Sequence, residues 1–186
     1  MRKLYGGAIV ADVPARFLDI SMFREVPDNQ EVYADVNTDE SVIVELLELD
    51  ESLSNDDAPI AFMSDVAKAN DCAIDNPEEC RVIERVTLSL GNMKSFGAEE
   101  ATLLVCCQNV SKFKENVRNA VVVYMVSVRI PMFGTDLLIS VNAPISIAEG
   151  SSSSFSTVKL PSQKEARDLA ISIAKSLKIV DKSLFG

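Results

Sequence analysis

The chain has 186 residues, of which 47% are hydrophobic and 25% charged, so we expect one globular domain over residues 1–186. No apolar run approaches the roughly 20 residues that a membrane-spanning helix needs, and we expect neither a membrane nor a nucleic-acid partner. Histidine is absent, which excludes Ser-His-Asp and Cys-His nucleophile systems and removes the commonest zinc ligand.

The net charge of −10 is unevenly distributed along the chain. Residues 25–67 contain thirteen carboxylates and neither Lys nor Arg, whereas the remaining residues hold 18 basic and 15 acidic side chains. A surface of one sign steers a basic partner and speeds association, so this stretch indicates a protein-binding site. The alternative is a solvated surface that only promotes solubility. The net charge and the absence of heptads also predict a monomer.

The N-terminal part of the chain reads as strands and turns. Residues 4–13 predict a strand that ends at Pro14, with Gly6-Gly7 meeting a conformational need at its entry. The Pro27-Asp28-Asn29 turn leads into two strands over residues 31–36 and 41–49, which residues 37–40 join as a β-hairpin.

The second strand of this hairpin is ambiguous. A helix would place Glu45 and Glu48 on one face, whereas a strand places them on opposite faces, since their separation is odd. The β-branched run Val42-Ile43-Val44 favours the strand. A bulge or the strand end near Leu47 could then re-aim Glu48.

The rest of the chain predicts two helices and four long strands. An acidic loop over residues 51–57 precedes a helix over residues 59–70, and a second loop covers residues 71–80. Four strands follow over residues 81–90, 101–110, 120–130 and 135–142, apolar on both faces as in a sheet covered on each side. A closing helix begins near Pro161 with an apolar seam of Leu169, Ile173 and Leu177. We expect Leu184-Phe185 to pack onto the sheet as an anchor.

The four cysteines match no metal or redox motif. Cys72 and Cys80 lie in a polar loop, and Cys106 and Cys107 are adjacent in a strand, so we expect reduced, mostly buried thiols in an intracellular protein. A Cys72–Cys80 bridge stays open. The phosphate-cradling glycine motifs are missing, so the sequence offers no positive evidence for an enzyme and predicts no cofactor and no metal.

Five blocks occur in order along nearly the whole chain: "LYGGAI", "REVPDNQEVYAD", "SVIVELLELD", "GTDLLISVNAP" and "VDKSLFG". They resemble the Ran guanine nucleotide release factor family, the Mog family of nuclear-transport regulators. The resemblance implies an α/β (α+β) fold with a twisted, largely antiparallel six-stranded sheet sandwiched between helices in a single domain.

The resemblance also implies a function without covalent chemistry. A member of this family binds the small GTPase Ran, favours its nucleotide-free form and so releases GTP, which places it in the nucleus and cytoplasm. In the family the acidic positions of the IVELLE block are implicated in Ran binding, which here are Glu45 and Glu48. Glu25, Asp28 and Glu31 of the neighbouring block are their expected companions. The alternatives are a scaffold module of the same fold that does not exchange nucleotide and, third, an enzyme.

Overall fold

The computed structural model describes residues 1–111, 117–155 and 157–186. Its largest element is a sheet of seven described strands in the order β3-β4-β5-β9-β8-β7-β6, in which every neighbouring pair is antiparallel. The strands are β3 Leu18–Asp19, β4 Gln30–Asp35, β5 Glu40–Glu48, β6 Cys80–Ser89, β7 Glu100–Val110, β8 Asn119–Ile130 and β9 Thr135–Ser146.

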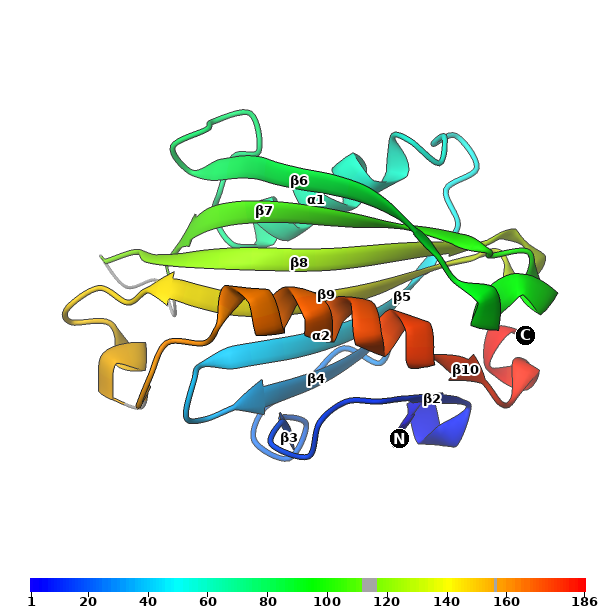
Figure 1. Cartoon of the computed structure of the whole chain (residues 1–186), viewed down its shortest axis with the longest axis horizontal. Coiled ribbons are helices and arrows are strands. Elements are labelled where there is room, and N and C mark those ends of the chain that lie inside the picture. The colour runs from blue at the N-terminus through cyan, green and yellow to red at the C-terminus, as the bar shows by residue number, and fades with distance from the viewer. Residues whose placement is uncertain (112–116, 156) are drawn as a thin grey trace.

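One helix covers each face of this sheet (Figure 1). Helix α2, Gln163–Ser176, crosses the front face in Figure 1, and α1, Ala58–Ala69, lies behind β6 and β7. Two separate apolar clusters fill the space between the layers, one against α2 and one beneath α1. The central strands β7, β8 and β9 are therefore largely buried on both sides, which explains their continuous apolar sequence and confirms the predicted sandwich. The edge strand β6 is mostly exposed, so the expectation that it too is covered on both faces is wrong.

The α2 face also carries a small second sheet of three strands in the order β1-β2-β10. Its strands are β1 Arg2–Leu4, β2 Ile9–Ala11 and β10 Lys178–Ile179. The predicted single strand over residues 4–13 is therefore wrong, because a 3₁₀ turn over Tyr5–Gly7 folds the chain back into a hairpin. Gly6 adopts φ 65° in this turn, a left-handed conformation that glycine adopts without steric cost.

The main sheet has seven described strands where six were expected. The short strand β3 adds an edge to β4 through only two residue pairs, too short a segment to give an alternating pattern in the sequence. The predicted hairpin over residues 31–36 and 41–49 is confirmed as β4 and β5, and the predicted strands over residues 81–142 are confirmed as β6 to β9.

Helix α1 matches its predicted bounds to within one residue, and α2 begins near Pro161 as predicted but ends at Ser176, before Leu177 of the predicted seam. Helix α2 starts after Ser162, whose hydroxyl accepts a hydrogen bond from the backbone N–H of Glu165 at 3.3 Å, a serine N-cap. Its buried stripe consists of Ala166, Ala170, Ile173 and Ala174, and Leu177 is buried at its end. No helix in the described ranges is long and apolar enough to cross a membrane.

The state of the cysteines and the packing of the C-terminal residues agree with the expectations from the sequence. All four cysteines are free; Cys72, Cys80 and Cys106 are buried and Cys107 is half-buried. Leu184 and Phe185 lie in a C-terminal 3₁₀ turn, Lys182–Phe185, and pack against the α2-side core, as predicted.

Candidate protein-interaction site

The predicted site residues lie in the loop before β4 and on the paired strands β4 and β5, on both faces of this hairpin. The loop before β4 turns at Pro27, whose carbonyl accepts from the Gln30 N–H at 2.9 Å. Asn29 fixes this loop to β5: the Leu46 N–H donates to the Asn29 carbonyl at 2.9 Å, and the Asn29 side-chain amide donates to the Leu46 carbonyl at 3.1 Å. Glu25 and Asp28 lie exposed in this loop.

Glu45 is held by two side-chain amides of the same block. Its Oε1 accepts from Gln30 Nε2 at 2.8 Å and from Asn29 Nδ2 at 3.3 Å. Gln30 is the residue directly opposite Glu45 in the β4–β5 ladder, so the hairpin register brings the amide to the carboxylate. Both bonds reach one oxygen, and Glu45 forms no ion pair within the described ranges, so its negative charge is oriented but not neutralised.

Glu31 is held more tightly, on the other face of the hairpin. It pairs with Val44 across the ladder; its Oε1 accepts from the Tyr5 backbone N–H at 2.6 Å and its Oε2 from the Tyr33 hydroxyl at 2.7 Å. Burial and the nearby Glu31 carboxylate raise the pKa of both phenols, so both remain protonated donors. Glu31 therefore joins the N-terminal turn to the sheet.

Tyr5 and the amides of Asn29 and Gln30 are positioning residues that the sequence reasoning did not single out. Tyr5 has a positive φ of 49°, unusual for a side chain of its size. Its hydroxyl shares its single proton between the carbonyls of Asn29 at 3.0 Å and Val44 at 2.9 Å, and this contact holds the strained turn in place. The signal was present in the quoted blocks "LYGGAI" and "VPDNQE", where these three residues stand beside the acids.

Glu45 and Glu48 do not share a face. The β5–β9 register runs without a shift from Ser41 to Glu48, so the bulge considered near Leu47 is absent from this ladder and the two carboxylates point to opposite sides. Glu48 is exposed at the last position of β5. Its backbone pairs with Thr135 of β9, but neither a hydrogen bond nor an ion pair joins its carboxylate to another part of the chain that the structure describes.

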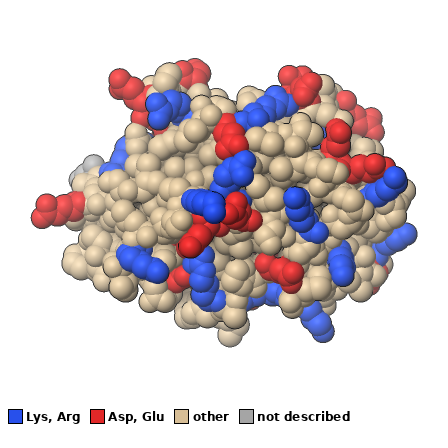
Figure 2. All heavy atoms as spheres, in the orientation of Figure 1, with Lys and Arg blue, Asp and Glu red and all other residues tan. Residues whose placement is uncertain are grey.

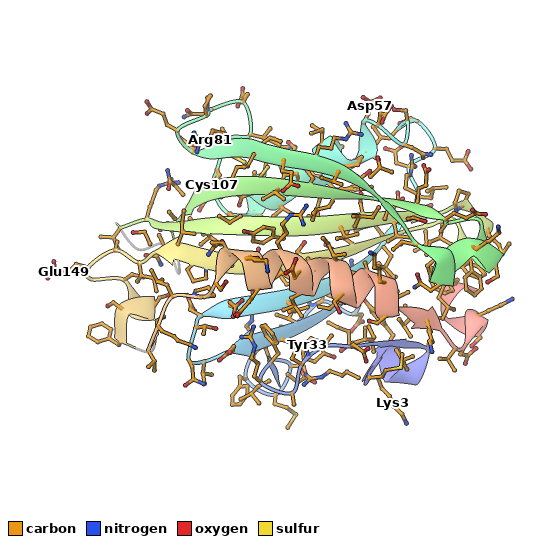
Figure 3. The ribbon with its side chains drawn as sticks, in the orientation of Figure 1. Lys3, Tyr33, Asp57, Arg81, Cys107 and Glu149 are labelled. Atoms are coloured by element: carbon orange, nitrogen blue, oxygen red, sulfur yellow. The ribbon has the colours of Figure 1, made fainter. Side chains whose placement is uncertain are left out.

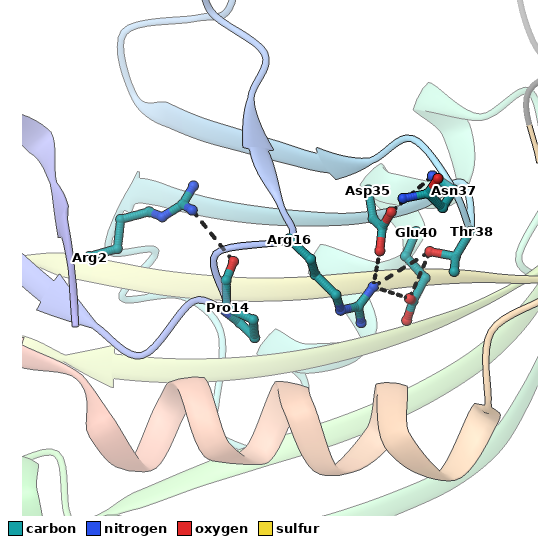
Figure 4. Close-up of polar contacts among 7 residues, drawn as sticks. All are labelled: Arg2, Pro14, Arg16, Asp35, Asn37, Thr38 and Glu40. Carbon is teal, nitrogen blue, oxygen red and sulfur yellow. Dashed lines mark hydrogen bonds and ion pairs between the residues drawn. The ribbon is translucent and has the colours of Figure 1, made fainter.

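Two carboxylates of the acidic stretch are buried in a contact with Arg16 and are therefore not part of the exposed surface (Figure 4). Arg16 Nη1 contacts Asp35 Oδ2 at 2.5 Å and Glu40 Oε2 at 2.6 Å, and both acids are almost completely buried. Burial raises the pKa of Asp35, but the hydrogen bonds from Arg16 and from the Asn37 N–H outweigh it and hold the pKa below its usual value. The tertiary fold thus supplies a cation that the local sequence lacks.

Arg129 holds the start of the acidic loop over residues 51–57 through backbone carbonyls, and its ion pair is with Asp136 of β9. Its guanidinium donates to the carbonyls of Asp50 at 2.6 Å and Leu53 at 2.5 Å and to the buried Asp136 carboxylate at 3.0 Å. Asp57, in this loop, and Tyr33, beside the candidate site, lie at opposite edges of the molecule in Figure 3. Asp57 therefore lies away from Tyr33, whereas the segment that Arg129 holds begins at Asp50, two residues after Glu48.

On the α2 face, charge is less segregated than it is along the sequence. Basic and acidic side chains are interspersed there (Figure 2). Within the described ranges no group of three or more Cys, Asp or Glu is arranged to hold a metal ion. The site as described offers carboxylates to a basic partner, with Glu25, Asp28 and Glu48 exposed and Glu31 and Glu45 oriented by hydrogen bonds.

Comparisons with known proteins agree along the whole chain. The sequence model of the family described as "Ran-interacting Mog1 protein" matches residues 2–144. The "Ran guanine nucleotide release factor" of Danio rerio is 38% identical over 186 residues, which cover 100% of this chain and 99% of that protein. The "Nuclear import protein mog1" of Schizosaccharomyces pombe is 34% identical over 197 residues and covers 100% of both chains. The crystal structure of the Saccharomyces cerevisiae Ran-binding protein Mog1p matches with a TM-score of 0.73 and 28% identity, covering 100% of this chain and 97% of that one.

Proposed function

Because the chain belongs to the Ran-interacting Mog1 family, we infer that it binds the small GTPase Ran, promotes release of the guanine nucleotide that Ran holds, and takes part in nuclear transport. The observation that carries this inference is the similarity, from end to end, to a protein named Ran guanine nucleotide release factor. We further propose that residues 1–186 act as one Ran-binding domain, that the protein works as a monomer in nucleus and cytoplasm, and that the released nucleotide is GTP.

We propose that Glu25, Asp28, Glu31, Glu45 and Glu48 form the Ran-binding site. The supporting geometry is their position around the open end of one hairpin, where the loop before β4 is bonded to β5. The five carboxylates differ in how firmly hydrogen bonds hold them. Glu31 and Glu45 are oriented in advance by Tyr5, Tyr33 and the amides, which lowers the entropy lost on binding, whereas the exposed carboxylates act first in steering.

Nucleotide release requires no chemistry on the nucleotide. If the protein binds empty Ran more tightly than loaded Ran, linkage requires that its binding weaken the nucleotide by the same factor. A carboxylate supplies this difference in one of two ways: it competes for the Lys or Mg²⁺ that contacts the phosphates, or it holds a switch loop of Ran out of place. Both routes rest on the carboxylates alone, and we propose a binding protein without covalent catalysis.

The test is nucleotide release from Ran loaded with fluorescent GTP. Addition of the protein should accelerate loss of the nucleotide, and the acceleration should saturate with protein concentration as a complex forms. Binding without faster release would support the scaffold alternative. If the protein neither binds Ran nor accelerates loss of the nucleotide, the inferred function is wrong, and a search for enzymatic substrates becomes the next step.

A further inference from the structure

Five lysines come together at one end of the α2 face, where several elements meet. Although both signs of charge occur across this face, basic side chains gather over the end of α2 and the small sheet (Figure 2). Lys175 lies in the last turn of α2, Lys178 in β10 and Lys182 in the C-terminal 3₁₀ turn. Lys3 lies in β1, and Lys94 in the short 3₁₀ helix that follows β6. All five side chains are exposed, and together they form the lysine strip.

Strand register aligns two of these lysines. Lys3 of β1 and Lys178 of β10 both pair with Val10 of β2, so their side chains point to the same face of the small sheet. Two strand spacings, about 10 Å, separate their backbones, and three residues of an extended chain span the same distance. The small sheet therefore presents two lysines at a spacing that suits carboxylates along an extended peptide.

The short 3₁₀ helix brings two more lysines to the end of α2. The side-chain amide of Asn92 donates to the Leu177 carbonyl at 2.7 Å, which fixes this helix against α2 two residues before Lys94. The Lys182 ammonium lies 5.5 Å from the centre of the Phe96 ring, which belongs to the same helix. These contacts hold segments that are far apart in the sequence, and with them their lysines, beside the end of α2.

Most of the positive charge on the lysine strip is not neutralised by the described residues. Lys94 lies 4.0 Å from Glu99, but the two side chains are 74% and 57% exposed, so this ion pair is weak. The other four lysines form no ion pair in the part of the chain that the structure describes. Two acids that border the strip are engaged elsewhere: Asp12 contacts the N-terminal amine at 3.2 Å, and Asp181 accepts from the Ser183 N–H at 2.9 Å.

The helix dipole accounts for only part of this arrangement. Cations at the end of a helix meet its negative pole, which explains Lys175 and, just beyond it, Lys178. Lys3, Lys94 and Lys182 belong to other elements and have no such role. Like charges gathered on one surface repel one another, and an anionic partner removes that repulsion. The lysine strip is thus suited to a negatively charged occupant, in a chain whose own net charge is −10.

Three features favour an acidic peptide over a nucleic acid or a membrane. All cations of the strip are lysines, whereas phosphate recognition commonly uses the planar fork of arginine. The aromatic rings beside the strip are occupied, since Lys182 lies over Phe96 and Phe133 stacks on Phe185, so they do not offer a stacking platform for bases. The net charge of −10 repels a large anionic surface, whereas a short acidic segment meets mainly the lysines.

We propose that the lysine strip binds an extended, acidic segment of a partner protein, whose carboxylates meet the exposed ammonium groups. This inference goes beyond the proposed function, because the carboxylates proposed for Ran binding attract a basic surface and the strip attracts an acidic one. Glu48 borders the same C-terminal turn that carries Lys182, so the two surfaces adjoin without sharing a residue. The protein therefore presents two neighbouring surfaces of opposite charge.

The experiment measures binding of a fluorescein-labelled decaglutamate peptide to the full-length protein by fluorescence anisotropy. The peptide should bind at low salt and weaken steeply as salt is added, whereas a decaglutamine peptide should not bind. Lys175→Gln combined with Lys178→Gln should weaken binding about fivefold, because two cations of the strip are lost while the side chains keep nearly their size. Lys175→Arg combined with Lys178→Arg keeps both charges and should keep the affinity.

A matched pair of substitutions separates the lysine strip from bulk charge. Lys68→Gln combined with Lys164→Gln also removes two charges, from lysines outside the strip that are 71% and 88% exposed, and should leave the affinity unchanged. Equal losses from the two glutamine double variants, or no binding of decaglutamate at low salt, would overturn the proposal. So would tighter binding of oligouridylate or of vesicles that contain phosphatidylserine, since the occupant would then be a nucleic acid or a membrane. The assay contains no Ran, so these outcomes leave the proposed function untouched.

Discussion

Replacing Arg16 by alanine should destabilise the protein more than the loss of an ordinary surface ion pair. The change leaves Asp35 and Glu40 buried without the guanidinium that both contact, at 2.5 and 2.6 Å. Removing one partner of a buried ion pair costs about 3–5 kcal/mol, because an uncompensated charge stays behind. The Arg16 side chain is 40% exposed, so water reaches the cluster and we expect the lower end, about 3 kcal/mol.

Urea and thermal unfolding at pH 7 measure this loss. For a chain of this size about 3 kcal/mol corresponds to a fall in melting temperature of about 6–12 °C. Part of the loss also comes from Phe17, whose ring lies 4.2 Å from the Arg16 guanidinium carbon. Adding Glu40→Gln to Arg16→Ala removes one of the two unpaired charges and should recover part of the stability.

The loss should depend on pH in a defined direction. The folded pKa of Asp35 is held below its unfolded value of about 3.9, so the Arg16 contact contributes fully above that value and is lost as the pH falls through the folded pKa. In Arg16→Ala this contribution is missing at every pH. The difference between the two proteins should therefore be largest above about pH 5 and shrink toward pH 3.

Arg85→Ala is the matched control. It also removes an arginine paired with an acid of the 25–67 stretch, but its partner Asp56 is 92% exposed, so the melting temperature should barely change. Equal losses for Arg16→Ala and Arg85→Ala, or a double variant no more stable than Arg16→Ala, would refute the view that the buried carboxylates need this cation.

Three further predictions concern the surface, the thiols and the assembly. Charge reversal by Glu45→Lys or Glu48→Lys should slow GTP release from Ran about tenfold or more, since attraction becomes repulsion, whereas Asp57→Lys in the loop held by Arg129 should alter mainly the on-rate and its salt dependence. Circular dichroism should show Glu48→Lys fully folded, whereas Glu45→Lys also loses the hydrogen bonds from the side-chain amides of Asn29 and Gln30. If GTP release falls equally at all three positions, bulk charge and not a defined site does the binding. In native protein a thiol reagent should label Cys107 first and Cys106 last, because burial raises the pKa of the Cys106 thiol to about 12; prompt labelling of all four cysteines would contradict the packing beneath α1. Light scattering at moderate salt should give a mass near 20.3 kDa, and a stable dimer would show that an apolar surface taken as free is covered by a second copy.

The sequence alone was sufficient wherever the information is local. The β-branched run Val42-Ile43-Val44 and the turn before it predicted a strand over a competing helix, and β5 confirms that choice. The bounds of α1 and β6 to β9 and the start of α2 followed in the same way from periodicity and from flanking prolines and glycines, because these patterns reflect which side chains face a core within one element. The five quoted sequence blocks were sufficient to identify the family.

What the sequence could not supply was the pairing of distant segments. Arg16 meets Asp35 and Glu40 across 19 and 24 residues, so a stretch that reads as uncompensated acid contains a neutralised cluster. The small sheet joins Val10 to Lys178, and the two-residue strand β3 was too short to give a pattern.

The site shows the same division. Its five carboxylates could be named from the sequence, but their facing could not, since a bulge of one residue would have moved Glu48 to the other side of β5. Tyr5 orients Glu31 from 26 residues away, and the ring of Phe133 stacks on that of Phe185 in the C-terminal turn. Such contacts depend on how whole layers pack and on strand register, and these are decided only when the chain closes its long-range pairings.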